Sequence, residues 1–270
     1  MTVFASKVAA AAHVPAERLE RLSGGDLSEV LLVRRPDGRL SVAKGGGSAV
    51  ATEAAMLRAL ADGGAPVPLV EGELDGVLLL EHIANDAVFS ERAWGAIGAA
   101  LRRLHARTGE SYGWPVDYQL GTVTLENRER RDWPGFWGEQ RLLSTAAILD
   151  RPWRERVAAL AGRLGDLLPD APPPSLLHGD LWTGNILVRE GSLAALIDPA
   201  CYHGHSEVDL AMLTLFDTPG ASFWDGYGAP EPGWEERRAA YQLFPALVHL
   251  RLFGATYAGM ADRLLSALGV

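Results

Sequence analysis

The first third of the chain has short apolar runs bounded by turn residues, and this pattern predicts strands. The runs cover residues 19–23, 29–34, 39–44, 68–72 and 77–83. A Pro-Asp-Gly turn at residues 36–38 and Asp75-Gly76 each separate two runs, as in β-hairpins. Residues 49–61 instead have apolar positions at helical spacing. We therefore expect about five strands and one helix before residue 84.

The pattern becomes mainly helical after residue 85. Residues 90–107 form an amphipathic segment with Ser90 in position to be its N-cap. Two short strands on either side of Glu190-Gly191 interrupt the helical part. Further helical patterns cover residues 133–149, residues 153–168 and most of the chain from residue 208, except a loop at 219–232; the two strands are expected at 185–189 and 194–198. The order predicts an α+β, bilobal fold, with a small antiparallel-sheet lobe (1–83) and a larger helical lobe (84–270).

Composition and charge argue against some classes of function. Hydrophobic residues make up 48% and charged residues 22%, as in ordinary globular proteins. The formal charge of −9 and the lack of a basic stripe argue against a nucleic-acid partner. No apolar run approaches the ~20 residues of a membrane span, and the first residues do not resemble a secretion signal. The single cysteine, Cys201, suits a reducing compartment. We expect a cytoplasmic protein without a membrane partner, and the sequence indicates no oligomeric state.

Lysine is rare, so each lysine is informative. Among the 25 basic residues only Lys7 and Lys44 are lysines. Lys44 ends the third predicted strand in Val42-Ala43-Lys44, like the V-A-I-K lysine that contacts ATP phosphates. A lysine at a strand end is otherwise usually solvent-facing. Glu53, at the start of the next helix, is a candidate ion-pair partner for Lys44, or simply a favourable acid in a first helical turn.

The most informative motif is His-Gly-Asp-Leu-Trp-Thr-Gly-Asn at residues 178–185. It has the H-x-D-L-x-x-x-N spacing of kinase catalytic loops. In that pattern Asp180 accepts a hydrogen bond from the attacking hydroxyl, and Asn185 offers a carbonyl oxygen to Mg²⁺. Asp198, at the end of the following strand, is a second candidate ligand. The alternative is a turn capped by its own side chains. We expect His178 to brace the loop rather than react.

Two segments of the first lobe are candidates for binding ATP itself. Gly24 and Gly25 lie between the first two predicted strands, where glycine lets backbone N–H groups approach phosphates. The alternative interpretation, that these glycines only form an ordinary turn, is equally good. The end of the fifth run, with Glu81 and Ile83, resembles an interlobe hinge whose backbone would hydrogen-bond adenine.

Taken together, the residues resemble the fructosamine kinases, or ketosamine-3-kinases, which are relatives of aminoglycoside and choline phosphotransferases. The resemblance covers most of the chain and rests on residues 178–185, 197–200, 202–212, 232–237, 241–243 and 252–254. It implies a protein-kinase-like fold. It also implies transfer of phosphate from ATP, with Mg²⁺, to the 3-hydroxyl of a sugar attached to an amine, such as a fructosamine or ribulosamine.

The resemblance also implies roles for individual residues. Asp180 corresponds to the base, and Asn185 and Asp198 to the Mg²⁺ ligands. Trp182 corresponds to a residue that stacks on the sugar, whereas the alternative is a core tryptophan under the loop. Asp209 corresponds to a helix-borne carboxylate that receives backbone hydrogen bonds from the catalytic loop.

Two other functions stay open at this point. One is the same chemistry on a different small-molecule hydroxyl, such as that of an aminoglycoside, because the sequence does not define the acceptor. The other is a nucleotide-binding pseudokinase that acts as an interaction module. The presence of all four polar groups, on Lys44, Asp180, Asn185 and Asp198, counts against the pseudokinase.

Overall fold

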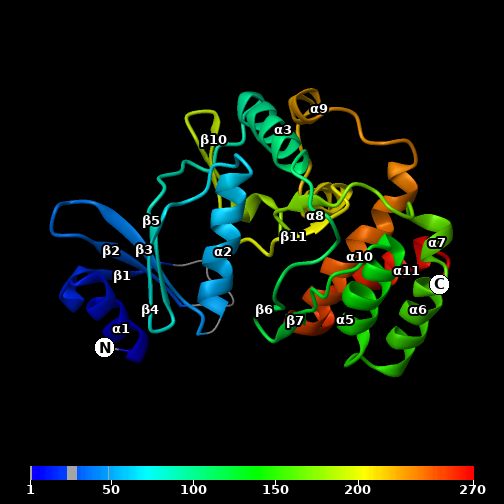
Figure 1. Cartoon of the computed structure of the whole chain (residues 1–270), viewed down its shortest axis with the longest axis horizontal. Coiled ribbons are helices and arrows are strands. Elements are labelled where there is room, and N and C mark those ends of the chain that lie inside the picture. The colour runs from blue at the N-terminus through cyan, green and yellow to red at the C-terminus, as the bar shows by residue number, and fades with distance from the viewer. Residues whose placement is uncertain (1, 23–28, 48) are drawn as a thin grey trace.

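The computed structural model describes residues 2–22, 29–47 and 49–270 (Figure 1). A five-stranded antiparallel sheet lies at one end of the molecule, and helices make up most of the rest. The strand order is β1-β2-β3-β5-β4. The strands are β1 Leu19–Arg21, β2 Val30–Arg34, β3 Leu40–Gly45, β4 Val70–Leu74 and β5 Val77–Glu81. The five predicted strands are therefore present, with ends shifted by up to two residues.

Helices cover both faces of this sheet, because its central strands are apolar on both sides. Along β5, Val77 and Leu79 pack against α1 (Val3–Ala12), whereas Leu78 and Leu80 pack against α2 (Ala49–Asp62). The second side of α2 contributes to the core of the helical lobe, so this helix lies between the sheet and that lobe (Figure 1). The sequence analysis did not predict α1, whose alanine-rich sequence has only weak amphipathic periodicity.

The larger lobe is built from helices around one hydrophobic core. Its longest helix, α10, passes close to α8, α11 and the segment around residue 140. The helices are α3 Glu91–His105, α4 Trp133–Trp137, α5 Ser144–Ala146, α6 Arg151–Ala161, α7 Leu164–Leu167, α8 Glu207–Phe216, α9 Ala221–Tyr227, α10 Trp234–Phe253 and α11 Ala258–Ala267. Since the sheet ends at Glu81 and the helices begin at Glu91, we propose residue 83 as the boundary between the lobes.

The structure corrects several predicted elements. The helix expected at residues 133–149 contains a π-helical turn, Gly138–Leu143, between α4 and α5. The helix expected at 153–168 is broken after α6, which ends at Ala161 with Gly162 as its C-cap. The strand expected at 194–198 is β10, Ser192–Leu196, and it pairs with β9, Ile186–Arg189. Asp198 therefore follows the strand instead of ending it.

Four short strands were missed. They form two antiparallel pairs: β6 (Tyr118–Leu120) with β7 (Val123–Leu125), and β8 (Ser175–Leu177) with β11 (Tyr202–Gly204). Three residues are too few for an alternating pattern to stand out. The second pair also joins segments on either side of the catalytic loop, which no local pattern reveals.

A fully buried arginine holds the β6–β7 hairpin in place. Arg141 is 0% exposed, and its guanidinium donates hydrogen bonds to the carbonyl oxygen of Glu126 and, at 2.7 Å, to Oδ1 of Asn127. It also lies 4.1 Å from the ring centre of Tyr202. Burial lowers the pKa of Arg141. Because Glu126 and Asn127 directly follow β7, Arg141 fixes the path of the chain where it leaves the hairpin.

We predict that Arg141→Met destabilises the protein by about 2–4 kcal/mol, because it removes the cation–π contact and leaves buried acceptors unpaired. The free energy of unfolding is measured by urea titration followed by circular dichroism. The control is Arg151→Met, since Arg151 pairs with Glu155 on the surface of α6 and its side chain is 79% exposed. Equal effects of the two substitutions would contradict the anchoring role.

Candidate active site

The catalytic loop leaves β8 through a turn that requires glycine. Gly179 has a φ of 83°, and a Cβ atom at this position would lie 2.0 Å from the carbonyl oxygen of Ala200. Any other residue would clash with backbone that has little freedom to move. The central Gly of the motif therefore lets the loop fold tightly against residues 197–200, which bring Asp198 to the site.

Two carboxylates, one on α8 and one directly after it, hold the catalytic loop in place. Asp209 accepts hydrogen bonds from the backbone N–H of His178 (2.8 Å) and of Gly179 (2.9 Å). Its Oδ2 also lies 3.0 Å from Nε2 of His105 on α3. Asp217, just after α8, accepts hydrogen bonds from both the backbone N–H and the hydroxyl of Thr183. The loop is thus fixed at both ends of one helix.

Asp209 is charged despite complete burial. Burial alone would raise the pKa of Asp209, but the hydrogen bonds from His105 and the Gly179 N–H hold it below its ordinary value. The two backbone hydrogen bonds that the resemblance implies for Asp209 are present in the structure.

His178 links the loop to the strand that precedes Asp198. Its Nε2 lies 2.9 Å from the carbonyl oxygen of Ile197, so Nε2 carries the proton. Its own carbonyl accepts from the N–H of Ala200 at 2.9 Å. Burial lowers the pKa of His178, which keeps the ring neutral. These contacts hold the catalytic loop against residues 197–200, as expected for a residue that braces the loop.

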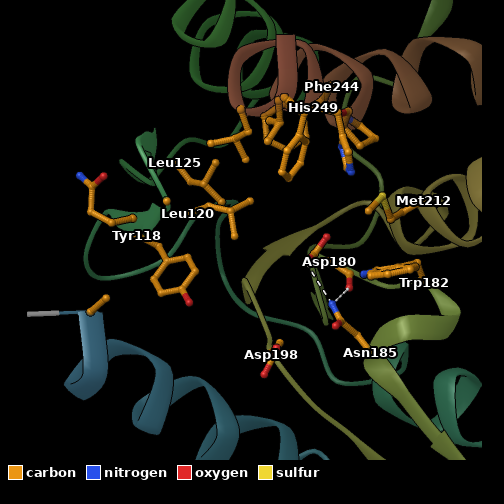
Figure 2. Close-up of a pocket in the computed structure, with 18 of the residues that line it drawn as sticks. Tyr118, Leu120, Leu125, Asp180, Trp182, Asn185, Asp198, Met212, Phe244 and His249 are labelled. Atoms are coloured by element: carbon orange, nitrogen blue, oxygen red, sulfur yellow. Dashed lines mark hydrogen bonds between the residues drawn. The ribbon is translucent and has the colours of Figure 1, made fainter. Parts of the chain in front are cut away.

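Asp180 and Asn185 face each other across the loop (Figure 2). The Asn185 side-chain N–H₂ donates to the backbone oxygen of Asp180 at 2.8 Å and to its Oδ2 at 3.0 Å. Oδ1 of Asp180 is left for another partner. Burial raises the pKa of Asp180 to about 7, and the nearby charge of Asp198 adds to this effect, against the lowering by the Asn185 hydrogen bond. Asp180 therefore has a much higher proton affinity than a surface aspartate.

An ion-pair network joins the two lobes at the same place. Nζ of Lys44 lies 2.6 Å from Oε1 of Glu53 and 2.7 Å from Oδ1 of Asp198. Burial would lower the pKa of Lys44, but the two carboxylates outweigh it and the lysine stays charged. Asp198 has a φ of 55°, which is uncommon outside glycine and is often found at functional sites.

The oxygen atoms at this centre fit a hard divalent cation. Because the N–H₂ group of Asn185 is turned toward Asp180, its Oδ1 is left available as a ligand. The carboxylate of Asp198 is half-exposed and lines the same cavity. A carboxylate and an amide oxygen are suitable Mg²⁺ ligands alongside phosphate oxygens.

These groups line a cavity of about 580 Å³ between the lobes (Figure 2). Trp182 is 41% exposed and lies over Gly184, so it is not a core residue under the loop. The structure brings six predicted site residues to this cavity: Lys44, Glu53, Asp180, Trp182, Asn185 and Asp198.

The other predicted site residues lie elsewhere. His178 and Asp209 are buried beneath the loop. Glu81 ends β5, where its backbone N–H donates to Leu69, and neither it nor Ile83 is among the described residues that line the cavity. The cavity therefore does not test the hinge assignment, which stays a prediction. The predicted phosphate-binding glycines, Gly24 and Gly25, lie outside the described residues.

Sequence reasoning missed several residues at the site. Tyr118 comes from the unpredicted β6, and Phe244 and His249 come from α10; all three line the cavity (Figure 2). Asp217 was missed because an Asp at a helix end is a common local feature. None of these positions carries a motif, since they meet the catalytic loop only through the tertiary fold.

Comparisons with known proteins agree with the motif resemblance. The model of the fructosamine kinase family matches residues 4–269. A protein of Lactiplantibacillus plantarum described as a probable ketoamine kinase is 37% identical over 201 residues, which cover 71% of this chain and 70% of that protein.

Solved structures confirm the fold. A structure from Thermobifida fusca described as a putative fructosamine-3-kinase superposes with a TM-score of 0.86 at 30% identity, covering 98% of each chain. An aminoglycoside phosphotransferase, APH(4)-Ia, superposes with a TM-score of 0.64 at 17% identity, over 92% of this chain and 93% of its own, which shows a shared fold alone. The predicted bilobal, protein-kinase-like architecture is therefore confirmed. With a family match from residue 4 to residue 269, the chain belongs to the fructosamine kinase family.

Proposed function

We propose that this chain transfers the γ-phosphate of ATP to the 3-hydroxyl of a ketoamine, a ketose sugar joined to an amine, such as a fructosamine or ribulosamine. Family membership makes it a phosphotransferase that acts on a hydroxyl group. The observation that carries the proposal is the convergence of Lys44, Asp180, Asn185 and Asp198 on one cavity. It also counts against the pseudokinase alternative.

Asp180 is the proposed base. Asn185 occupies Oδ2 of Asp180, which leaves Oδ1 to accept a hydrogen bond from the sugar hydroxyl. During transfer a bond forms between the sugar oxygen and the γ-phosphorus, the bond from that phosphorus to the bridging oxygen of ADP breaks, and the hydroxyl proton passes to Oδ1. The raised proton affinity of Asp180 favours this last step.

Lys44, Asn185 and Asp198 are the proposed phosphate and metal ligands. Bound Mg²⁺ would supply neutralisation of the phosphate charge, held by Asp198 and Oδ1 of Asn185. Lys44 is a buried cation held in place by Glu53, so it is already oriented toward the phosphates. We propose that the backbone near Glu81 and Ile83 binds adenine.

Trp182 is the proposed sugar contact. It is two residues past Asp180, half-exposed and on the cavity wall. An indole there offers a flat apolar surface to one face of a sugar ring, and its N–H can bind a hydroxyl.

The remaining expectations concern the membrane, the cellular location and the substrate partner of the enzyme. In the part of the chain that the structure describes, none of the helices is both long and apolar enough to cross a bilayer. The proposal includes a cytoplasmic location, supported by Cys201 as a buried free thiol. It also includes a ketoamine, either free or on a protein, as the substrate partner of the site.

We predict that Asp180→Asn keeps ATP affinity but loses turnover by roughly 10²–10⁴-fold, the usual contribution of a positioned base. Turnover is followed by a coupled ADP assay, and ATP affinity by calorimetry. The matched control is Asp166→Asn, at an exposed position on α7, which retains wild-type turnover. Near-normal activity of the Asp180 variant would remove it from the base role.

A second prediction ranks the metal ligands. Asp198→Ala abolishes Mg²⁺-dependent nucleotide binding, whereas Asn185→Ala weakens it less, because Asp198 brings a full charge and Asn185 only a carbonyl dipole. Nucleotide affinity is measured at increasing Mg²⁺ for each variant. Equal losses would contradict the ranking.

A third prediction concerns the acceptor. A synthetic fructosamine is phosphorylated on its 3-hydroxyl, whereas kanamycin is not, because the described cavity wall lacks the acidic rim that several ammonium groups need. Phosphorus NMR of the product identifies the modified hydroxyl. Phosphate on another hydroxyl, or a preference for kanamycin, would overturn the substrate assignment and leave the fold standing.

A further inference from the structure

The cavity extends well beyond the residues that transfer phosphate. Its far part is walled by α8, α10, the β6–β7 hairpin and the turn after α10 (Figure 2). We call this part the apolar chamber and define it by Leu125, Met212, Phe216, Val248, His249, Phe253 and Tyr257. The proposed function so far gives this chamber no role.

Aromatic rings form a continuous row from the catalytic loop into the chamber. Trp182 meets Phe216 edge-on with ring centres 6.4 Å apart. Phe216 lies 4.9 Å from His249, which lies 4.8 Å from Tyr257 and 5.5 Å from Phe253. The row begins at the residue proposed to contact the sugar, so a group attached to that sugar can continue along it.

Charge is confined to the other end of the cavity. The Lys, Asp and Glu side chains among the described lining residues are Lys44, Glu53, Asp180 and Asp198, all at the transfer centre. In the chamber the ionisable rings are His249 and Tyr257. His249 uses Nδ1 to bind the carbonyl of Pro245 at 2.8 Å, and burial lowers its pKa, which keeps it neutral. A charged group placed here would lose hydration without gaining a partner.

We propose that the apolar chamber binds an aromatic substituent on the amine nitrogen of the ketoamine. This inference rests on the proposed function and names the substrate class of the same site. The amine is attached at C1 of the ketose and the reacting hydroxyl at C3, so the nitrogen substituent is two carbons from the reacting position. With the sugar against Trp182, the row of rings that begins there offers this substituent an apolar surface. Aromatic walls favour a ring that packs edge-to-face or offset against them. The adduct of free lysine would instead bring a charged α-amino group and a charged α-carboxylate toward this uncharged wall.

The test compares four synthetic ketoamines of fructose, made from methylamine, butylamine, benzylamine and 4-carboxybenzylamine. We expect kcat/KM for the benzyl compound to exceed that for the methyl compound by about 10–100-fold, the effect of burying one apolar side chain. The butyl compound falls between them. The carboxybenzyl compound, which carries a charged para carboxylate on the same ring, falls to or below the methyl compound.

Variants locate the effect in the chamber. Phe253 is 40% exposed, so Phe253→Ala removes an aromatic wall without opening the core. It lowers the benzyl-to-methyl ratio of kcat/KM by about two- to tenfold, the range for losing one aromatic contact. The control is Ile148→Ala, an exposed apolar residue outside the cavity lining, which keeps the wild-type ratio.

The outcomes separate this inference from the proposed function. Phosphorylation of all four compounds with equal kcat/KM, or a preference for the butyl or carboxybenzyl compound, would overturn the aromatic subsite and leave the kinase activity standing. An unchanged ratio in Phe253→Ala would overturn the assignment of the chamber. Transfer to none of the compounds would overturn the proposed function, and this inference with it.

Discussion

The hydrogen bonds that the backbone N–H groups of His178 and Gly179 donate to the Asp209 carboxylate are the contacts on which the rest of the site depends. They hold a buried carboxylate charged and fix the first turn of the catalytic loop. The second end of α8 repeats the arrangement with Asp217 and Thr183. One helix thereby sets the position of the whole loop, including Asp180. Because α8 also lines the cavity, the same helix places the catalytic loop and part of the surface that we propose binds the substrate.

The loop in turn positions the groups that lie across the lobe boundary. His178 binds the backbone at Ile197, next to Asp198, and Asp198 pairs with Lys44 from the sheet lobe. Glu53 holds Lys44 from the other side, so a buried cation is fixed at the position where we propose that the phosphates bind. Such a preorganised charge needs little rearrangement during transfer, which is the main contribution that a protein makes to this chemistry. The network therefore gives Lys44, one of two lysines in an arginine-rich chain, a defined electrostatic role.

Much of the fold and of the polar site could be predicted from the sequence, because both depend on local signals. The hairpin turns, the strand runs and the catalytic-loop spacing are each contained in a few consecutive residues, and Lys44 is conspicuous by its rarity. The apolar chamber could not be predicted. Its wall comes from three-residue strands, from α8 and from α10, which are far apart in the sequence. In addition, an apolar residue such as Phe244 or Val248 has the same helical spacing whether it packs in the core or lines a cavity. Arg141 was similarly hidden, since nothing in the sequence distinguishes a buried arginine from the many exposed ones.

The central claim about this protein is that it transfers phosphate to one particular hydroxyl of a ketoamine. The most direct test measures initial rates of ADP formation with a synthetic fructosamine and with its 3-deoxy analogue, which differ only in the oxygen proposed to face Asp180. We expect ADP formation with the fructosamine and only background ATP hydrolysis with the 3-deoxy analogue. Equal rates with both compounds would contradict transfer to the 3-hydroxyl, because phosphate would then be passing to a different acceptor.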